Sequence, residues 1–412
     1  MVIAINCMIN RVFAIAFVFL LPLPGAAREV AGRLLAGDSR LLRGSQAGDL
    51  RLLRGSQAGD SNRPAVLCSE FIYDSAAFPE CHAATIAETP DGLVTAFFGG
   101  TRERDPDVCI YLSRKSRGSD HWSAPQEIAN GLQSDSTRYP CWNPVLYQIP
   151  GGDLLCFYKV GPSPASWKGW LLRSKDGGYT WSRPAALPEG FLGPIKNQPA
   201  VAADGTLICP SSREGNGWQI CFELSPDGGR TWQMAKAVPT PPPSAAGAER
   251  NSEDGVTAAF EAIQPALFMH KDGTIQALCR SKNQVILSTT SNDNGRTWSL
   301  LRPTSLPCNN SGLDGITLAD GRQLLVYNHV SPPPGKSRGE RSPLNVAVSP
   351  DGNTWWAALV LENDHAGEYS YPSVIQSADG MVHIVYTWHR KKIRYIRLDP
   401  SKMILKKIVA KN

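Results

Sequence analysis

The sequence predicts an all-β protein built as one six-bladed β-propeller, and three observations support this prediction. A turn motif recurs, Asp-Gly turns separate short apolar runs, and helical periodicity is nearly absent from residue 64 onward. The five tryptophans that end the motif are separated by 59, 51, 66 and 57 residues, a repeat length typical of propeller blades. The motif copies are SKDGGYTW (Ser174–Trp181), SPDGGRTW (Ser225–Trp232), SNDNGRTW (Ser291–Trp298), the shorter SPDGNTW (Ser349–Trp355) and a degenerate copy at Ser113–Trp122.

The motif is interpreted as a turn that leads into a new strand. Ser and Asp side chains can bond the backbone of their own turn, and Gly adopts positive φ without strain. The Thr-Trp pair then places a large apolar anchor at the start of the next strand. We therefore assign the motif a role in folding and none in catalysis.

Asp-Gly pairs between apolar runs predict one hairpin for each blade, because this dipeptide favours tight turns. They lie at Asp91-Gly92, Asp204-Gly205, Asp272-Gly273, Asp320-Gly321 and Asp379-Gly380, and Gly151-Gly152-Asp153 fills the remaining interval. Six hairpins and five motif turns predict six blades of about four strands each. The blade without a motif is expected to be closed by strands from both chain ends, which protects the sheet edges. The stretch Pro239–Gly255 is expected to be a surface insertion that interrupts blade four.

The chain before the propeller is predicted to hold a signal peptide, residues 1–27, and a linker, residues 28–63. Arg11 precedes the apolar run Val12–Leu21, and Gly25-Ala26-Ala27 offers a small-residue cleavage site. The run is too short for a convincing membrane span, although an uncleaved anchor is an alternative. The linker repeats RLLRGSQAGD, a composition typical of disorder. We therefore expect a secreted or extracytoplasmic protein whose propeller occupies residues 64–412.

Charge and cysteine patterns narrow the expected partners. The formal net charge is +5, but much of the excess lies in the N-terminal tail, so we expect no nucleic-acid binding. No Cys or His pair has metal-ligand spacing, so the sequence predicts neither metal nor cofactor, and we expect a monomer. Candidates for disulfides lie in loop-like sequence: Cys68, Cys81, Cys141 and Cys308. The cysteines in apolar runs are expected to be buried thiols: Cys109, Cys156, Cys209, Cys221 and Cys279.

Polar residues that open the predicted inner strands are expected to form a ring at one mouth of the propeller. Residues equally far from a hairpin turn lie side by side, which places Gln264 beside Arg280 and Tyr371 beside Thr387. Each polar residue could instead cap a strand end, but the whole ring, with its nearby cations, favours a binding site. The ring comprises His82, Asn143, Asn197, Gln264, Asp314 and Tyr371, and the nearby cations are Arg102, Lys159, Lys196, Arg280 and Arg341.

The motif turns, the hairpins and the arginines together resemble the sialidase (neuraminidase) superfamily, in its broad branch of BNR or Asp-box repeat proteins. The resemblance covers about residues 66–400. It implies three arginines that hold a substrate carboxylate, a tyrosine nucleophile paired with a glutamate, and an aspartate that acts as acid and base. Arg280 in ALCRS fits the second arginine, Arg341 fits the third, and Tyr371 in YPSV fits the nucleophile.

The loop TRERDPDV fits the acid/base region of that family, with Asp105 as first choice and Asp107 as second, and it also carries Arg102. Two positions depart from the family pattern. His82 stands where an arginine belongs, and its ring cannot reproduce the forked contact of a guanidinium with a carboxylate. Gln264 stands where the glutamate partner of the tyrosine belongs, and an amide cannot accept the phenol proton.

Other carboxylates and a second tyrosine keep alternatives open. Glu261 or Glu368 could replace the missing base if the backbone brings either one close to Tyr371. Tyr369 should point the same way as Tyr371 on a regular strand, so it is an alternative nucleophile.

The resemblance implies a secreted glycoside hydrolase of the exo-α-sialidase type that acts on an acidic sugar of a glycan. In this interpretation Tyr371 is the nucleophile and Asp105 the acid/base. The residues expected to bind substrate are Arg102, Arg280, Arg341, Gln264, Lys159, Lys196, Asn143 and Asp314. One alternative is a carbohydrate-binding propeller without turnover, since a fold does not settle function. The other is a hydrolase or lyase of a uronic-acid glycan, in which His82 acts as a general acid or base.

Overall fold

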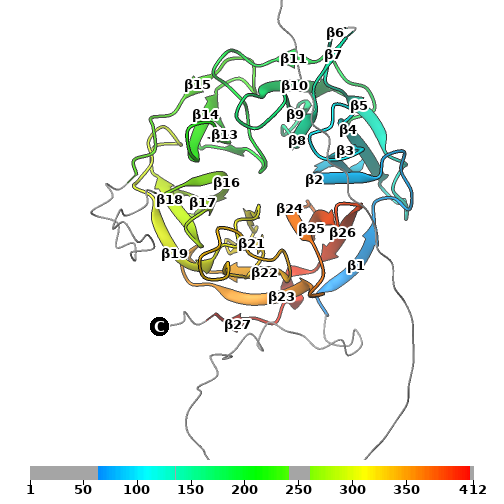
Figure 1. Cartoon of the computed structure of the whole chain (residues 1–412). Helices are drawn as coiled ribbons and strands as arrows, with labels where there is room; N and C mark the ends of the chain where they lie inside the picture. Colours follow the sequence, from blue (N-terminus) through cyan, green and yellow to red (C-terminus); the bar gives the residue numbers. More distant parts are fainter. Residues whose placement is uncertain (1–63, 135, 241–259, 409–412) are drawn as a thin grey trace, which may run out of the picture. The chain divides into compact units, whose positions relative to one another are not determined.

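The computed structural model describes residues 64–134, 136–240 and 260–408, which form a six-bladed β-propeller (Figure 1). The fold class is therefore as the sequence predicted. Within these ranges the helical structure is a single short 3-10 helix, η2 (Pro400–Lys402). No helix in the described part of the chain is long and apolar enough to cross a membrane. The predicted signal peptide and the linker lie outside the described residues and stay predictions, as does the surface location of the Pro239–Gly255 stretch, most of which is also outside them.

Each blade is an antiparallel sheet whose first-named strand lies nearest the propeller axis (Figure 1). Blade one contains β2 (Glu80–Thr89), β3 (Gly92–Gly100), β4 (Cys109–Ser116) and β5 (Gln126–Ala129). Blade two contains β8 (Cys141–Gln148), β9 (Leu154–Val160), β10 (Lys168–Ser174) and β11 (Ala185–Ala186). Blade three contains β12 (Ala200–Val201), β13 (Leu207–Arg213), β14 (Gln219–Ser225) and β15 (Gln233–Met234).

The second half of the chain repeats this arrangement. Blade four contains β16 (Ala262–Met269), β17 (Ile275–Ser281), β18 (Val285–Ser291) and β19 (Arg302–Pro307). Blade five contains β20 (Asp314–Thr317), β21 (Gln323–Tyr327), β22 (Leu344–Ser349) and β23 (Trp356–Glu362), with β27 (Lys406–Lys407) added at its outer edge. Blade six contains β24 (Tyr369–Gln376), β25 (Val382–Trp388), β26 (Lys392–Leu398) and β1 (Val66–Phe71). A small hairpin, β6 (Leu132–Ser134) and β7 (Thr137–Arg138), lies between blades one and two in sequence.

Blade six, which lacks the turn motif, is closed by strands from both ends of the propeller, as predicted. The first strand, β1, pairs antiparallel with β26, with Ser69 opposite Ile396. The expected position of the Pro239–Gly255 stretch was wrong, because it follows β15 and precedes β16. It therefore connects blade three to blade four and interrupts neither sheet.

The turn motif forms the internal hydrogen bonds that its composition predicts. In the copy at Ser225, the Gly229 amide donates to Ser225 Oγ over 2.7 Å, and the Thr231 amide donates to Asp227 Oδ1 over 2.7 Å. In the degenerate copy, the Ser113 hydroxyl has no hydrogen-bond partner. The motif is therefore a self-contained turn in which one carboxylate and one hydroxyl satisfy the backbone.

The tryptophan of each motif packs against the preceding blade. Trp298 of blade four stacks on Phe222 of blade three, with ring centroids 3.6 Å apart and planes 12° apart. Trp232 meets Phe157 of blade two edge to face, with ring centroids 6.0 Å apart and planes 83° apart. Because these rings join neighbouring blades, the motif contributes to the contacts between blades as well as forming its own turn.

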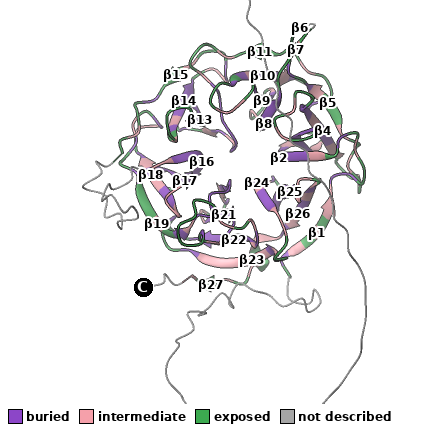
Figure 2. Ribbon diagram, in the orientation of Figure 1, coloured by how far each residue is buried: buried purple, intermediate pink, exposed green. Residues whose placement is uncertain are grey.

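Burial decreases from the axis outward (Figure 2). Every residue of β17 is buried, whereas both residues of β11 and of β15 are exposed. The inner strands are therefore the place where polar side chains are held with little access to water.

The disulfide candidates proved wrong, because all nine cysteines of the described residues are free thiols. The cysteines expected in loops lie on strands or pack in the core. Cys81 is buried in β2, where its sulfur accepts a hydrogen bond from the Tyr73 hydroxyl. Cys308 is buried beside the Ser281 amide.

Replacing Trp298 with Ala should test the inter-blade packing. We expect Trp298→Ala to lower the free energy of unfolding by about 3–5 kcal/mol, because a large buried ring leaves a cavity against Phe222. Tyr179→Ala, at a half-exposed ring of another motif, should cost less than about 1 kcal/mol. Urea denaturation of both variants measures the difference, and equal losses would contradict the proposed role of the motif tryptophan.

Candidate active site at the axial mouth

Bulges in the inner strands explain how the polar residues reach the axis. The strand register breaks after His82 in β2, after Trp142 in β8, after Ile263 in β16 and after Ser370 in β24. A left-handed residue occupies each break: Ala83 (φ 57°), Asn143 (φ 34°), Gln264 (φ 54°) and Tyr371 (φ 53°). A bulge re-aims side chains that regular alternation would direct elsewhere.

The same bulge separates the two tyrosines of blade six. Tyr369 is buried in the core, with an exposed fraction of 2%, whereas Tyr371 is half-buried and faces the polar cluster at the axis. The expectation that both rings point the same way was therefore wrong, because the left-handed Tyr371 breaks the alternation of the strand. Tyr371 is the tyrosine that the structure places in the site.

Tyr371 lies at the centre of the candidate site. Its phenol oxygen accepts a hydrogen bond from Arg280 Nη1 over 2.8 Å and another from Gln264 Nε2 over 3.3 Å. Arg280 Nη1 also donates to Gln264 Oε1, and Arg280 Nε donates to Asn310 Oδ1. Arg341 lies over the aromatic ring of Tyr371, with its guanidinium carbon 5.8 Å from the ring centroid. The structure thus brings together Tyr371, Arg280, Arg341 and Gln264, as the sequence predicted.

His82 packs directly against Tyr371, with ring centroids 4.2 Å apart. Burial lowers the pKa of His82 well below its usual value, and the nearby cations Arg390 and Arg341 lower it further. A neutral ring at ordinary pH removes the reason for treating His82 as an acid that titrates near neutrality.

The hydrogen bonds of Thr387 indicate which ring nitrogen of His82 carries the proton. The Thr387 hydroxyl oxygen accepts the Ala83 amide and lies 2.9 Å from His82 Nδ1. We assign the ring proton to Nε2, because the Thr387 hydroxyl, which already accepts the Ala83 amide, can then donate its own proton to Nδ1. His82 can then offer a ligand a neutral N–H donor at Nε2.

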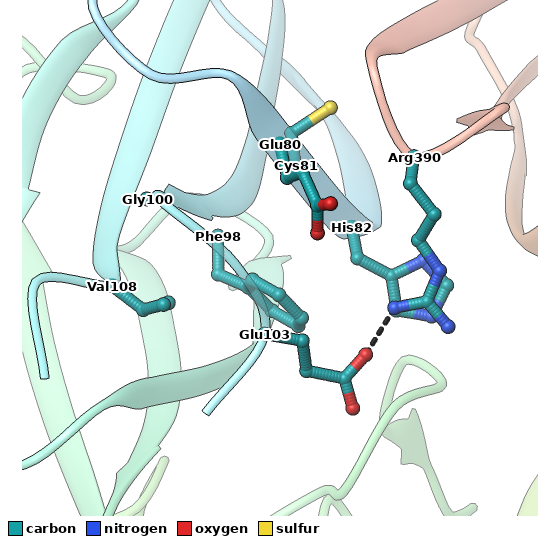
Figure 3. Close-up of a pocket in the computed structure, with 8 residues that line it drawn as sticks. All are labelled: Glu80, Cys81, His82, Phe98, Gly100, Glu103, Val108 and Arg390. Carbon is teal, nitrogen blue, oxygen red and sulfur yellow. Dashed lines mark hydrogen bonds and ion pairs between the residues drawn. The ribbon is translucent and has the colours of Figure 1, made fainter. Parts of the chain in front are cut away.

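A chain of alternating charges lies beside His82. Glu368 Oε1 accepts from Arg341 Nη1 over 2.7 Å and from Arg390 Nε over 2.8 Å. Arg390 also pairs with Glu103, and Figure 3 shows this pair next to His82 in a small pocket. Burial alone would raise the pKa of Glu368, but Arg390 and Arg341 hold it below its usual value. Glu368 is therefore an ionised bridge between two arginines, and it does not contact Tyr371.

Several predicted binding residues hold the propeller together instead. Lys159 is fully buried and donates to the Pro194 carbonyl, and burial lowers its pKa to about 7. Lys196 is buried and donates to the carbonyls of Leu313 and Pro372. Asp314 accepts the amides of Gly315 and Val374, and burial raises its pKa. These residues cap strands, which was the alternative interpretation of the ring.

The acidic loop of blade one lies differently from the expectation. Arg102 pairs with Asp105 at 3.3 Å, and the arginine side chain is 71% exposed, so Arg102 does not join Arg280 and Arg341. Asp107 accepts the amide and hydroxyl of Thr101 within its own loop. Glu103, which sequence reasoning did not select, is the residue of this loop that reaches the site, through Arg390.

Two further carboxylates lie on the rim near blade four. Glu261 pairs with Lys282 at 2.7 Å and accepts the Trp218 amide, so it does not contact Tyr371 as the sequence had allowed. Glu214 lies in the turn between β13 and β14 and was not selected from the sequence. Arg390 and Glu214 come from turns that carry no recurring motif, so no sequence signal pointed to them, whereas Glu103 lies in the loop that the sequence did indicate. In the described ranges no group of three metal-binding side chains occurs.

Comparisons with known proteins agree with this architecture. The BNR repeat-like domain matches residues 91–384. The chain belongs to the BNR repeat-like family. No curated protein sequence matches the chain.

Solved structures with the same fold include several sialidases. A protein of unknown function from Dyadobacter fermentans has a TM-score of 0.62 and 18% identity, covering 81% of this chain and 98% of its own. The NanB sialidase from Streptococcus pneumoniae has a TM-score of 0.60 and 12% identity, and the match covers 81% of this chain and 71% of the NanB chain. The intramolecular trans-sialidase from Ruminococcus gnavus has a TM-score of 0.60 and 13% identity, and the match covers 82% of this chain and 99% of the trans-sialidase chain. These structural similarities show that the chain shares the propeller fold of the sialidases.

The lowered pKa of His82 predicts a pH dependence of stability. Below its ordinary pKa of about 6.5, the unfolded chain binds a proton that folded His82 resists. Stability should therefore be fully present above about pH 6.5 and fall as pH decreases, by up to about 1.4 kcal/mol per pH unit. We expect His82→Asn to flatten this slope in urea denaturation at a series of pH values, and His121→Asn, at an exposed histidine, to leave it unchanged. An unchanged slope in His82→Asn would show that His82 is charged in the folded protein.

Proposed function

We propose that this protein is a glycoside hydrolase of the sialidase type, acting on a carboxylated sugar at the axial mouth. The observation that carries the proposal is the contact between Tyr371 and Arg280, in which a guanidinium holds a half-buried phenol oxygen at 2.8 Å. Arg341 flanks the same ring, so two cations face the place where a sugar would stack or react. The sialidase-like fold and the BNR repeat-like domain support this proposal.

The charge of Arg280 favours an anionic ligand. Arg280 is 5% exposed, and its side-chain hydrogen bonds go to an asparagine, a glutamine and a tyrosine: Asn310, Gln264 and Tyr371. Within the described residues it forms no ion pair with a carboxylate. Burying a cation without a close counter-ion is costly, and a substrate carboxylate would offset that cost.

The chemistry of the ligand also favours a tyrosine as the reacting group. When the anomeric carbon carries a carboxylate, a carboxylate nucleophile would be repelled, whereas a phenol would not. Loss of the phenol proton develops negative charge on Tyr371 Oη, to which Arg280 and Gln264 already donate hydrogen bonds. Donors placed in advance around a developing charge lower the barrier.

A second candidate function is carbohydrate binding without turnover, and the identity of Gln264 favours it. The group that contacts Tyr371 Oη is an amide, and no described carboxylate contacts that oxygen to take its proton. A third possibility is hydrolysis or elimination of a uronic-acid glycan, which is supported by the presence of His82, packed on Tyr371, at the position of a sialidase arginine. We also propose that the protein is exported from the cytoplasm, on the basis of the predicted signal peptide.

An activity screen tests these functions against one another. We expect the wild-type protein to cleave a sialoside or a uronoside, and Tyr371→Phe to lose at least about 100-fold in kcat/KM because the nucleophilic oxygen is removed. Gln264→Glu should raise the rate on sialosides, because a carboxylate at this position can accept the phenol proton. The measurement is reducing-sugar release from sialyllactose and from glucuronides, with thermal unfolding as a control for folding.

The outcomes separate the candidates. Binding of these sugars with no turnover by wild type or Gln264→Glu would favour the binding propeller. Elimination would be recognised by an unsaturated product absorbing in the ultraviolet. Turnover that survives Tyr371→Phe would refute the role of Tyr371 as nucleophile, although the protein would still be an enzyme.

A further inference from the structure

The turn between β13 and β14 places an unpaired carboxylate on the rim of the site. Glu214 is half-buried, and within the described residues its side chain makes no hydrogen bond and no ion pair. Burial raises the pKa of Glu214, while Arg280 and Lys282 act in the opposite direction without reversing the shift. A carboxyl in this condition can hold a proton closer to neutral pH than an ordinary glutamate.

Both ends of this turn are tied to the inner strand of blade four. Before the turn, the backbone amide of Gln264 donates to Ser212 Oγ over 3.3 Å. After the turn, the Ala262 amide donates to the Trp218 carbonyl, and the Trp218 amide donates to Glu261. Glu214 therefore lies two residues after Ser212, whose hydroxyl accepts the backbone N–H of Gln264.

Arg280 connects the turn to the reacting tyrosine. Its guanidinium carbon lies 4.9 Å from the Trp218 ring centroid, and its Nη1 bonds Tyr371 Oη. The charged groups that face Glu214 are Arg280 and Lys282 of blade four, and Glu261 lies beside Lys282. Glu214 and Tyr371 thus approach Arg280 from blades three and six.

Three other acidic residues near the mouth are committed to cations, and Asp314 is committed to the Gly315 and Val374 amides. Glu103 pairs with Arg390, Glu368 with Arg341 and Arg390, and Glu261 with Lys282. An ion pair keeps a carboxylate ionised, which makes it a poor proton donor. Among these four glutamates, Glu214 alone has the environment of a group that exchanges a proton during a reaction.

We propose that Glu214 is the acid that protonates the leaving oxygen in the reaction proposed above, so this inference rests on that function. The Glu214 proton moves to the glycosidic oxygen, and the bond from that oxygen to the anomeric carbon breaks with its electron pair staying on oxygen. Tyr371 Oη bonds to the anomeric carbon, and the phenol proton passes to water. In the second step Glu214 takes a proton from the attacking water, whose oxygen bonds to the anomeric carbon as Tyr371 leaves and recovers a proton from solvent.

This role predicts a dependence on the leaving group that a structural role would not produce. We expect Glu214→Gln to lower kcat/KM at least about 100-fold on methyl α-sialoside or methyl β-glucuronide, whichever the wild type cleaves, because alkoxide needs protonation. On the matching 4-nitrophenyl glycoside the loss should stay below about 10-fold, because nitrophenolate leaves without help. The alkaline limb of the pH profile of kcat/KM should also disappear for the methyl glycoside.

Two variants in the same turn control for folding and chemistry. Asn216→Ala, at an exposed position, should leave both substrates unaffected, and Glu214→Asp should retain part of the activity on methyl glycosides. Equal losses of Glu214→Gln on methyl and nitrophenyl substrates, or no loss on either, would overturn the role of Glu214 and leave the proposed function intact. Absence of turnover of all four glycosides by the wild-type protein would instead refute the proposed function, and the acid role with it.

Discussion

The ammonium group of Lys196 lies where three blades meet, and the arrangement of the site depends on it. Its Nζ donates to Asn197 Oδ1 over 2.7 Å, to the Leu313 carbonyl over 3.0 Å and to the Pro372 carbonyl over 2.5 Å. Burial lowers the pKa of Lys196 to about 8, but three acceptors match its three donors. Because Pro372 directly follows Tyr371, this contact fixes the strand that carries the reacting group.

The polar ring at the axis therefore contains two kinds of residue with different tasks. Asn197 bonds the carbonyls of Gln264 and Pro265, and Asp314 bonds the Val374 amide, so both join neighbouring inner strands. Their bonds leave Tyr371 and Arg280 oriented toward the mouth. A site built in this way is preorganised, because its positioning contacts exist before any ligand arrives.

Much of the fold could be predicted from the sequence, because turn chemistry is local. Ser225, Asp227 and Thr231 lie within one motif and bond one another, so the motif revealed the blade repeat and the closure of blade six. The site was harder to predict. Counting residues outward from a hairpin turn assumes regular strand pairing, and the bulges break that pairing. Arg390 and Glu103 are 287 positions apart in sequence, and only the closed ring brings them together.

The orientation of individual loops could not be predicted from the sequence either. Arg102 and Asp105 were assigned to the site because their loop resembles the acid/base region of sialidases, but they pair with each other on an exposed loop. A usable signal was overlooked at the bulges, where Asn143, Gln264 and Tyr371 each precede a proline. Proline has no amide to donate to the neighbouring strand, so such pairs indicate a break in the ladder.

Calorimetric titration with simple sugars tests the central claim, that the axial mouth recognises a carboxylate. N-acetylneuraminate or glucuronate should bind, glucose should not, and added salt should weaken the binding. Arg280→Ala should abolish the heat of binding, whereas Arg183→Ala, at an exposed arginine, should leave it unchanged. Binding of glucose as tight as that of glucuronate, or full binding by Arg280→Ala, would contradict the claim.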